Sequence, residues 1–210
     1  MGFYDTDQGV QDYIKLAEGF DGAELIHWLG DYLPEQSSIL ELGMGPGKDL
    51  DILLKKYRAT GSDYSQVFLD RYLKAHPGAD IFQLDAVTME TTRRFDAIYS
   101  NKVLQHLSID ACRKSLAAQH KSLNNDGIVL HALWYGNEYE ELEGMGFQQY
   151  TEASFSQLLV GRFEILEAKI FTEMEQDDSI AFFLKRVSVW GMKIQLDPVL
   201  NGQFCACQSI

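Results

Sequence analysis

The amino-acid sequence predicts an α/β fold in which helices cover both faces of a mostly parallel sheet. Three observations lead to this class: short apolar segments alternate with helical patterns, the first of them runs into a glycine-rich turn, and acidic residues follow the next two. The chain has 210 residues, of which 46% are hydrophobic and 23% charged, as expected for one globular domain. No internal repeat or low-complexity linker divides the sequence.

The chain begins with two short helical patterns within residues 7–33. Apolar residues recur at helical spacing in both halves of this segment, and Gly19 and Gly22 interrupt the pattern between them. Pro34 then ends the segment. We expect two amphipathic helices that pack on the edge of the sheet or over its ligand-binding end.

Residues 37–49 form the stretch around which the rest of the chain is organised. They read Ser-Ser-Ile-Leu-Glu-Leu-Gly-Met-Gly-Pro-Gly-Lys-Asp, which predicts a buried strand, a tight turn and the start of a helix. Gly43, Gly45 and Gly47 allow the backbone to turn sharply and to approach a ligand. We expect the amides at the start of the helix to point outward as donors. The pattern is typical of a nucleotide-type cofactor loop, and an ordinary strand-turn-helix connection is the simpler alternative.

The glycine spacing distinguishes two kinds of cofactor loop. The dinucleotide fingerprint places its third glycine three residues after the second and needs no acid within the strand. Here the third glycine follows two residues after the second, and Glu41 lies near the end of the strand. The segment 41–47 closely resembles motif I of the class I S-adenosylmethionine-dependent methyltransferases. The resemblance implies S-adenosylmethionine as cofactor and S-adenosylhomocysteine as product, and a carboxylate at Glu41 suits a cofactor with an ammonium and a sulfonium group.

Two further strand ends carry acidic residues. A short strand after the first helix ends in Asp63, about 20 residues beyond the first glycine, where an acid commonly binds ribose hydroxyls. The third strand runs into Asp85 and Ala86. The resemblance implies that Asp85 accepts a hydrogen bond from the adenine amino group, that Ala86 leaves room for the ring, and that Tyr64 stacks on it. Capping of the following helix is the alternative role for both acids.

The fourth strand and its following turn lie within residues 95–107. The run Phe-Asp-Ala-Ile-Tyr-Ser followed by Asn-Lys-Val-Leu-Gln-His-Leu resembles the strand-four motif of these methyltransferases. The resemblance places Ser100 and Asn101 beside the cofactor, and Lys102 and His106 at the reaction cleft. His106 is the candidate catalytic base, because histidine titrates near neutral pH, and a place in the cleft wall is its alternative role.

The remaining segments complete the predicted architecture. They are a helix at 111–123, a fifth strand at 127–134, an acidic loop at 138–146, a helix at 151–159 and two strands at 163–171 and 179–187. The resemblance then implies a Rossmann-like three-layer sandwich with a mostly parallel seven-stranded sheet and an antiparallel C-terminal hairpin. Trp134 and Tyr135 are candidate substrate-binding residues, with ordinary core packing as the alternative. His131, within an apolar strand, is interpreted as a core histidine.

The predicted organisation has three parts. Residues 1–36 form a helical lid segment, residues 37–187 the S-adenosylmethionine-binding methyltransferase domain, and residues 188–210 a tail that is compatible with an extra strand. In similar methyltransferases such an N-terminal segment, here called the leader (residues 1–36), brings an aromatic hydroxyl near the cofactor carboxylate. Tyr13 is the candidate for this role, and a core position is the alternative.

Charge and composition exclude several classes of partner. The formal net charge of -13, without a local cluster of Lys and Arg, disfavours nucleic acid as a substrate. No apolar run reaches the ~20 residues that span a bilayer, and the N-terminus does not resemble a signal peptide, so we expect a cytoplasmic protein without membrane attachment. Cys112, Cys205 and Cys207 fit neither a disulfide framework nor a zinc site, so no metal is expected.

These observations predict an enzyme that transfers a methyl group from S-adenosylmethionine to a small-molecule acceptor by in-line displacement. One alternative is a non-catalytic protein that binds S-adenosylmethionine or S-adenosylhomocysteine in a regulatory or partner role. A nicotinamide-dependent oxidoreductase is a further alternative, and both the glycine spacing and Glu41 disfavour it.

Overall fold

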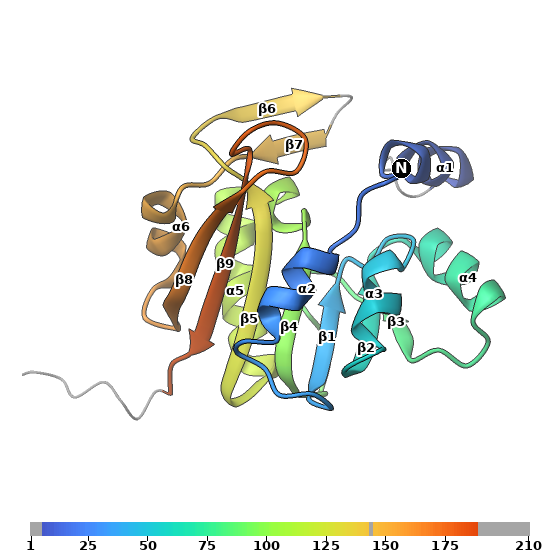
Figure 1. Ribbon diagram of the computed structural model, residues 1–210, viewed down its shortest axis with the longest axis horizontal. Helices are drawn as coiled ribbons and strands as arrows, with labels where there is room; N and C mark the ends of the chain where they lie inside the picture. The colour runs from blue at the N-terminus through green and yellow to red at the C-terminus, as the bar shows by residue number, and fades with distance from the viewer. Residues whose placement is uncertain (1–5, 143–144, 189–210) are drawn as a thin grey trace, which may run out of the picture.

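A seven-stranded sheet forms the centre of the computed structural model, which describes residues 6–142 and 145–188. The strand order is β3-β2-β1-β4-β5-β9-β8, and helices cover both faces of the sheet (Figure 1). This arrangement confirms the predicted fold class. The strands are β1 (Ser38–Leu42), β2 (Arg58–Asp63), β3 (Ile81–Gln83), β4 (Phe95–Asn101), β5 (Leu123–Trp134), β8 (Phe163–Phe171) and β9 (Ser179–Arg186).

The strand order reverses direction at β1. This strand pairs in parallel with β2 on one side and with β4 on the other, and the first five strands of the sheet are all parallel. The strand β9 runs antiparallel to β5, and β8 runs antiparallel to β9, as the sequence predicted for the final hairpin. In open α/β sheets, ligands bind beyond the carboxyl ends of the strands where the order reverses. The topology therefore predicts a ligand-binding site at the carboxyl ends of β1 and β4.

Two apolar cores lie on the two faces of the sheet. On one face the strands pack against α2 (Ala23–Leu29), α3 (Lys48–Leu53) and α4 (Gln66–Ala75). On the other face they pack against α5 (Ile109–Ser122) and α6 (Glu152–Leu159). Alternate residues of β1 serve the two cores, with Ile39 on the first face and Leu40 on the second. Burial on both faces explains the continuous apolar runs of the central strands.

Two segments lie beyond the carboxyl ends of the parallel strands. One is α1 (Asp7–Leu16), near α4, and the other is the hairpin of β6 (Tyr139–Leu142) and β7 (Met145–Gln148) (Figure 1). The short 3₁₀-helix η2 (Leu104–His106) follows β4 and contacts β7. These segments surround the end of the sheet at which the topology predicts a ligand.

The prediction of a loop over residues 138–146 is wrong, because β6 and β7 pair as an antiparallel hairpin with Tyr139 opposite Gln148. Acidic residues and a glycine suggested a loop, but the two strands satisfy each other's backbone groups and keep their acidic side chains exposed. The predicted strand in the tail falls on residues 189–210, which lie outside the described residues. Within the described ranges, no helix combines the length and the apolar character needed to cross a membrane.

Candidate functional site

Two adjoining cavities lie at the ends of β1 and β4. The first, of about 360 Å³, extends over the ends of β2 and β3, and we call it the strand-end cavity. The second, of about 420 Å³, extends under the β6–β7 hairpin and the end of α1, and we call it the hairpin cavity. Their shared lining residues are Tyr13, Gly43, Asn101, Lys102 and His106. The two cavities are therefore parts of one cleft.

Most of the sequence-predicted site residues line this cleft. Besides the shared residues, the strand-end cavity is lined by the predicted residues Gly45, Asp63, Tyr64, Asp85 and Ala86. The hairpin cavity is lined by the predicted residues Glu41 and Trp134. Residues that are distant in the sequence, from Tyr13 to Trp134 at the end of β5, thus line one cleft.

Three predicted residues line neither cavity. Gly47 packs under Tyr72, because a Cβ atom at Gly47 would overlap the tyrosine ring. Ser100 is fully buried, and Tyr135 packs against the core on the α5 and α6 face. Ser100 precedes the cleft residue Asn101 in β4, and successive residues of a strand point to opposite faces, which explains the place of Ser100.

Three amides of the glycine turn are engaged within the protein. The amides of Gly43 and Met44 both donate to the carbonyl of Ser62, at 2.8 Å each. The Gly45 amide donates to Asp63 Oδ2 at 2.8 Å. Gly45 has a φ of +50° and borders the cavity beside the Tyr13 ring, so its backbone conformation favours glycine. The turn therefore offers a close surface to a ligand and few donors to an anion.

Glu41 is a buried carboxyl group in the cleft wall. Its side chain is 3% exposed, and no described residue donates to its Oε2 atom. Burial, reinforced by the nearby carboxylates of Asp49 and Asp63, raises the pKa of Glu41 well above its ordinary value. A cationic ligand group beside Glu41 would provide the missing partner and favour the ionised form.

Asp63 and Asp85 each hold backbone amides at a strand end. Asp63 accepts from Gly45 and, at 2.8 Å, from Ser65. Burial raises the pKa of Asp63, and these backbone hydrogen bonds oppose the rise. Asp85 accepts from the Val87 amide at 2.6 Å. The alternative that these acids cap the following helix is wrong: Ser65 caps α4 by accepting from the Phe68 amide, and no helix lies between β3 and β4 among the described residues. Both carboxyl groups line the strand-end cavity.

Lys102 lies between the two cavities in a mostly buried position. Its Nζ atom contacts Glu173 at 2.9 Å, Ser179 Oγ at 2.6 Å and the Leu133 carbonyl at 3.3 Å. The same atom lies 3.5 Å from the centre of the Trp134 ring. Burial lowers the pKa of Lys102, and the carboxylate of Glu173 opposes this effect. The ammonium group is fully engaged by the protein.

His106 faces both cavities from η2. Its Nδ1 atom lies 3.1 Å from the Gly146 carbonyl, and its ring meets Phe147 edge to face, so the hairpin holds the imidazole in place. Burial lowers the pKa of His106, although its backbone hydrogen bonds raise it in part. The imidazole is therefore neutral at pH 7, which is the form that accepts a proton.

Sequence reasoning missed Asp49 and Glu173. Asp49, 8% exposed, accepts hydrogen bonds from the Gly22 amide at 2.6 Å, the Tyr99 hydroxyl at 2.7 Å and the Asn101 amide at 3.2 Å. It thereby links the leader to β4 at the cleft wall. In the sequence, an acid in the first turn of a helix matches the helix dipole and gives no sign of such distant partners. Glu173 likewise belongs to an acidic turn that looks like a solvated loop.

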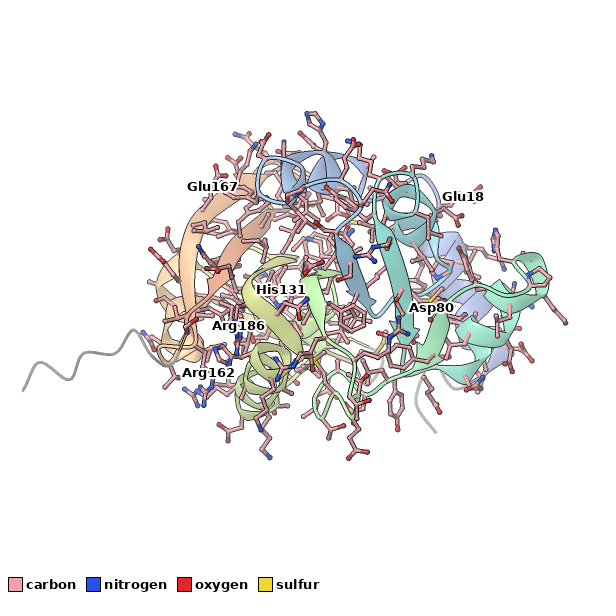
Figure 2. All side chains as sticks on the ribbon, turned by 90° about the horizontal axis from the view of Figure 1, so that it is seen from below. Glu18, Asp80, His131, Arg162, Glu167 and Arg186 are labelled. Atoms are coloured by element: carbon pink, nitrogen blue, oxygen red, sulfur yellow. The ribbon has the colours of Figure 1, made fainter. Side chains whose placement is uncertain are left out.

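His131 belongs to a buried polar chain below the cleft. Its Nδ1 atom lies 2.7 Å from Ser100 Oγ, and its Nε2 atom lies 2.8 Å from Gln119 Oε1. Gln119 in turn donates to Ser115 on α5 at 3.0 Å. Figure 2 places His131 in the interior, while Glu18, Arg162 and Glu167 lie at the periphery. The interpretation of His131 as a core histidine agrees with this position.

Comparison with known proteins gives one family model and one curated relative. Residues 39–127 match a family described as methyltransferase domain. The relative is trans-aconitate 2-methyltransferase of Enterobacter sp. (strain 638), which is 34% identical over 76 residues. That match covers 35% of this chain and 30% of the relative's length.

Solved structures resemble the chain over most of its length. A S-adenosylmethionine-dependent methyltransferase from Clostridium acetobutylicum has a TM-score of 0.70 with 14% identity, over 87% of this chain and 99% of its own. The 1,6-didemethyltoxoflavin-N1-methyltransferase of Burkholderia thailandensis has a TM-score of 0.73 with 17% identity, over 86% of this chain and 85% of its own. The chain therefore shares its fold with these S-adenosylmethionine-dependent methyltransferases, and its residues 39–127 match the methyltransferase domain family.

Proposed function

We propose that this protein is an enzyme that transfers a methyl group from S-adenosylmethionine to a small-molecule acceptor by in-line displacement. The observation that carries the proposal is the buried Glu41 carboxyl, whose Oε2 atom has no donor among the described residues and borders the cleft. A buried acceptor without a partner is costly unless a ligand supplies a donor. The ammonium group of S-adenosylmethionine is such a donor.

The rest of the cleft suits the same cofactor. In the proposed arrangement the adenosine part occupies the strand-end cavity, with Asp63 at the ribose, Tyr64 and Ala86 at the faces of the adenine ring and Asp85 at its amino group. The amino-acid part extends toward Glu41. The cofactor supplies an electrophilic methyl group on a positively charged sulfur.

The same geometry disfavours a nicotinamide dinucleotide. A pyrophosphate carries two negative charges and is held by free amides of a glycine turn. In this protein the amides of Gly43, Met44 and Gly45 are engaged internally, and Glu41 and Asp63 lie beside the turn. Carboxyl groups at this place repel a pyrophosphate and attract a sulfonium.

The chain's own residues contribute alignment, exclusion of water and proton acceptance. The leader covers the hairpin cavity through Leu16 and Phe20, which supports the proposed division into a lid over residues 1–36 and a catalytic domain over residues 37–187. The positive charge on sulfur disappears during methyl transfer. A site that excludes water and aligns the two reactants therefore accelerates the reaction most. Neutral His106 is placed to accept a proton from an acceptor that must lose one.

The size of the site and the named relatives support a small-molecule acceptor. The hairpin cavity has a volume of about 420 Å³, in the range of pockets for small ligands. The relatives named above are, by their titles, a trans-aconitate methyltransferase and a 1,6-didemethyltoxoflavin methyltransferase. The net charge of -13 supports a small molecule over a nucleic acid.

Titration calorimetry with three ligands tests the cofactor assignment. S-adenosylhomocysteine is expected to bind, 5′-methylthioadenosine to bind more weakly because it lacks the amino-acid part, and NADH not to bind. Glu41→Gln should weaken the binding of S-adenosylhomocysteine by roughly 1.5 to 3 kcal/mol, the value of a hydrogen bond to a charged group. It should leave the binding of 5′-methylthioadenosine unchanged.

The exposed Glu35→Gln variant is the matched control and should bind all three ligands as the parent does. Binding of NADH alone would overturn the proposal. Tight binding of S-adenosylhomocysteine without methyl loss from S-adenosylmethionine on any acceptor would instead identify a non-catalytic binding protein.

A further inference from the structure

We infer that the methyl acceptor is a small amine on an apolar body, and that carboxylate acceptors are excluded. The inference rests on the proposed function, since it names the acceptor that the hairpin cavity takes. Four observations carry it: the engagement of both cavity lysines, the excess of acidic groups, an unpartnered acceptor atom, and the apolar walls.

Both lysines that line the hairpin cavity are already neutralised or hydrogen-bonded. The three N–H groups of Lys102 have three partners, Glu173, Ser179 and the Leu133 carbonyl. Lys48 Nζ donates to the carbonyls of Ala17 and Phe20 at 2.6 and 3.3 Å. No arginine is among the residues described as lining this cavity. A carboxylate acceptor would thus meet Lys102 already paired with Glu173, and Lys48 with two of its N–H groups held by carbonyls.

Acidic groups outnumber basic ones in the same wall. Apart from Glu41, which the proposed function assigns to the cofactor's ammonium group, the cavity is lined by three carboxyl groups, those of Asp21, Asp49 and Glu173, and by two ammonium groups. In a low-dielectric cleft this imbalance attracts a cation and repels an anion. A protonated amine is therefore drawn to the site, whereas a polycarboxylate is repelled.

An unpartnered acceptor atom lies where the two cavities meet. Asn101 donates to Asp49 through its amide nitrogen, but its buried Oδ1 atom has no donor among the described residues. An amine N–H supplies that donor, while a carboxylate adds a further acceptor. Asn101 therefore favours an amine over a carboxylate, as the charged groups in the cavity wall do.

The other walls are apolar or aromatic. They include Leu16, Phe20, Trp134 and Phe147, together with the flexible side chains of Met145 and Met174. The Nζ atom of Lys102 lies over one face of the Trp134 ring, so a ligand cation cannot bind to that face. These walls fit an apolar or aromatic body that carries the amine.

The transfer step for such an acceptor balances without any other reactant. The protonated amine first gives one proton to the neutral imidazole of His106, which borders both cavities. The lone pair of the resulting neutral amine forms the new N–C bond to the methyl group as the C–S bond breaks, and the electron pair of that bond goes to sulfur, which becomes a neutral thioether. The methylated nitrogen carries the positive charge away, and the imidazolium returns its proton to water.

The test compares acceptor pairs that differ in charge and have similar bodies. Tryptamine is paired with indole-3-propionate, and 2-phenylethylamine with 3-phenylpropionate, and trans-aconitate is added as a polycarboxylate. Binding to the protein saturated with S-adenosylhomocysteine is followed by NMR, and methyl transfer from S-adenosylmethionine by mass spectrometry. The amine of each pair should bind at least tenfold more tightly, and only amines should be methylated.

Two variants shift the preference in a defined direction. Asp21→Asn should weaken the binding of the amines several-fold and leave the binding of the carboxylates unchanged. Glu173→Gln removes the ion-pair partner of Lys102 and should strengthen the binding of the carboxylates several-fold. The control is Glu175→Gln, because Glu175 lies exposed in the same turn, and it should change neither.

The outcomes separate this inference from the proposed function. If S-adenosylhomocysteine binds and the carboxylates bind as well as or better than the amines, or if no member of either pair binds, the inference is overturned and the cofactor assignment stands. If S-adenosylhomocysteine itself does not bind, both fail at the first step.

Discussion

Lys102 illustrates how one backbone angle can place a functional side chain. Its φ of +58° lies in the left-handed region, which costs a non-glycine residue roughly 1 to 2 kcal/mol. In this conformation the chain turns sharply after β4, and the ammonium group reaches Glu173 on the β8–β9 connection and Ser179 at the start of β9. Glycine would relieve the strain and lose the ion pair, so a lysine here is explained by its contacts.

His131 gives a pH-dependent contribution to stability. Full burial lowers the pKa of His131 to about 3, whereas the unfolded residue titrates near pH 6.5. Its folded pKa is depressed, so the unfolded state takes up the proton first. The contribution to stability is complete above about pH 6.5 and is lost as the pH falls, at about 1.4 kcal/mol per pH unit.

Urea unfolding of the protein should therefore show a free energy of unfolding about 2 kcal/mol lower at pH 5 than at pH 6.5 from this residue alone. His131→Gln should remove that part of the pH dependence. His27→Gln, which changes an exposed histidine, should retain it. Equal slopes for all three proteins would show that His131 is protonated in the folded state.

At the scale of elements, Asp49 connects the leader to the sheet. Asp49→Ala would leave the Gly22 amide and the Tyr99 hydroxyl without their buried acceptor. We expect a loss of about 2 to 4 kcal/mol in the free energy of unfolding, measured with urea. We also expect faster proteolysis within residues 17–22, because the leader loses its attachment.

Asp70→Ala is the control for this experiment. Asp70 is exposed on α4, and its side chain accepts only the local hydrogen bond from Gln66 among those of the described residues. Its loss should change stability by less than about 0.5 kcal/mol. Cleavage of the leader at the parental rate in Asp49→Ala would contradict the assignment of Asp49 as the connection.

At the scale of the whole molecule, a ligand that binds only the folded state must stabilise it. Both the leader and the hairpin contribute residues to the cleft, so cofactor binding should couple them to the sheet. S-adenosylhomocysteine at a hundred times its dissociation constant should add about 2.7 kcal/mol. For a chain of this size the melting temperature should rise by roughly 5 to 11 °C.

Differential scanning calorimetry measures this rise, and NADH at the same concentration should give none. An unchanged melting temperature with S-adenosylhomocysteine would contradict the proposed cofactor. A second, unshifted transition would show that the leader or the hairpin unfolds independently of the cleft.

The sequence by itself determined the fold class, the order along the chain of the strands in the seven-stranded sheet and most of the residues that we propose for cofactor binding. Strand periodicity and the glycine turn are local signals, and Glu41, Asp63 and Asp85 each end a strand, so the parallel topology necessarily brings them to one edge. The hairpin at β6 and β7 was missed because acidic composition resembles a loop, whereas strand pairing depends on the partner segment.

Only the tertiary structure decided what each polar group is free to do. The Gly45 amide is engaged by Asp63, 18 residues away, and Lys102 by Glu173 in a distant turn. No local pattern encodes such pairings, because they depend on which side chains meet when the two layers close over the sheet. The same closure left Glu41 and Asn101 with unpartnered oxygens among the described residues, and the proposed preference of the cleft for cationic groups rests on these atoms.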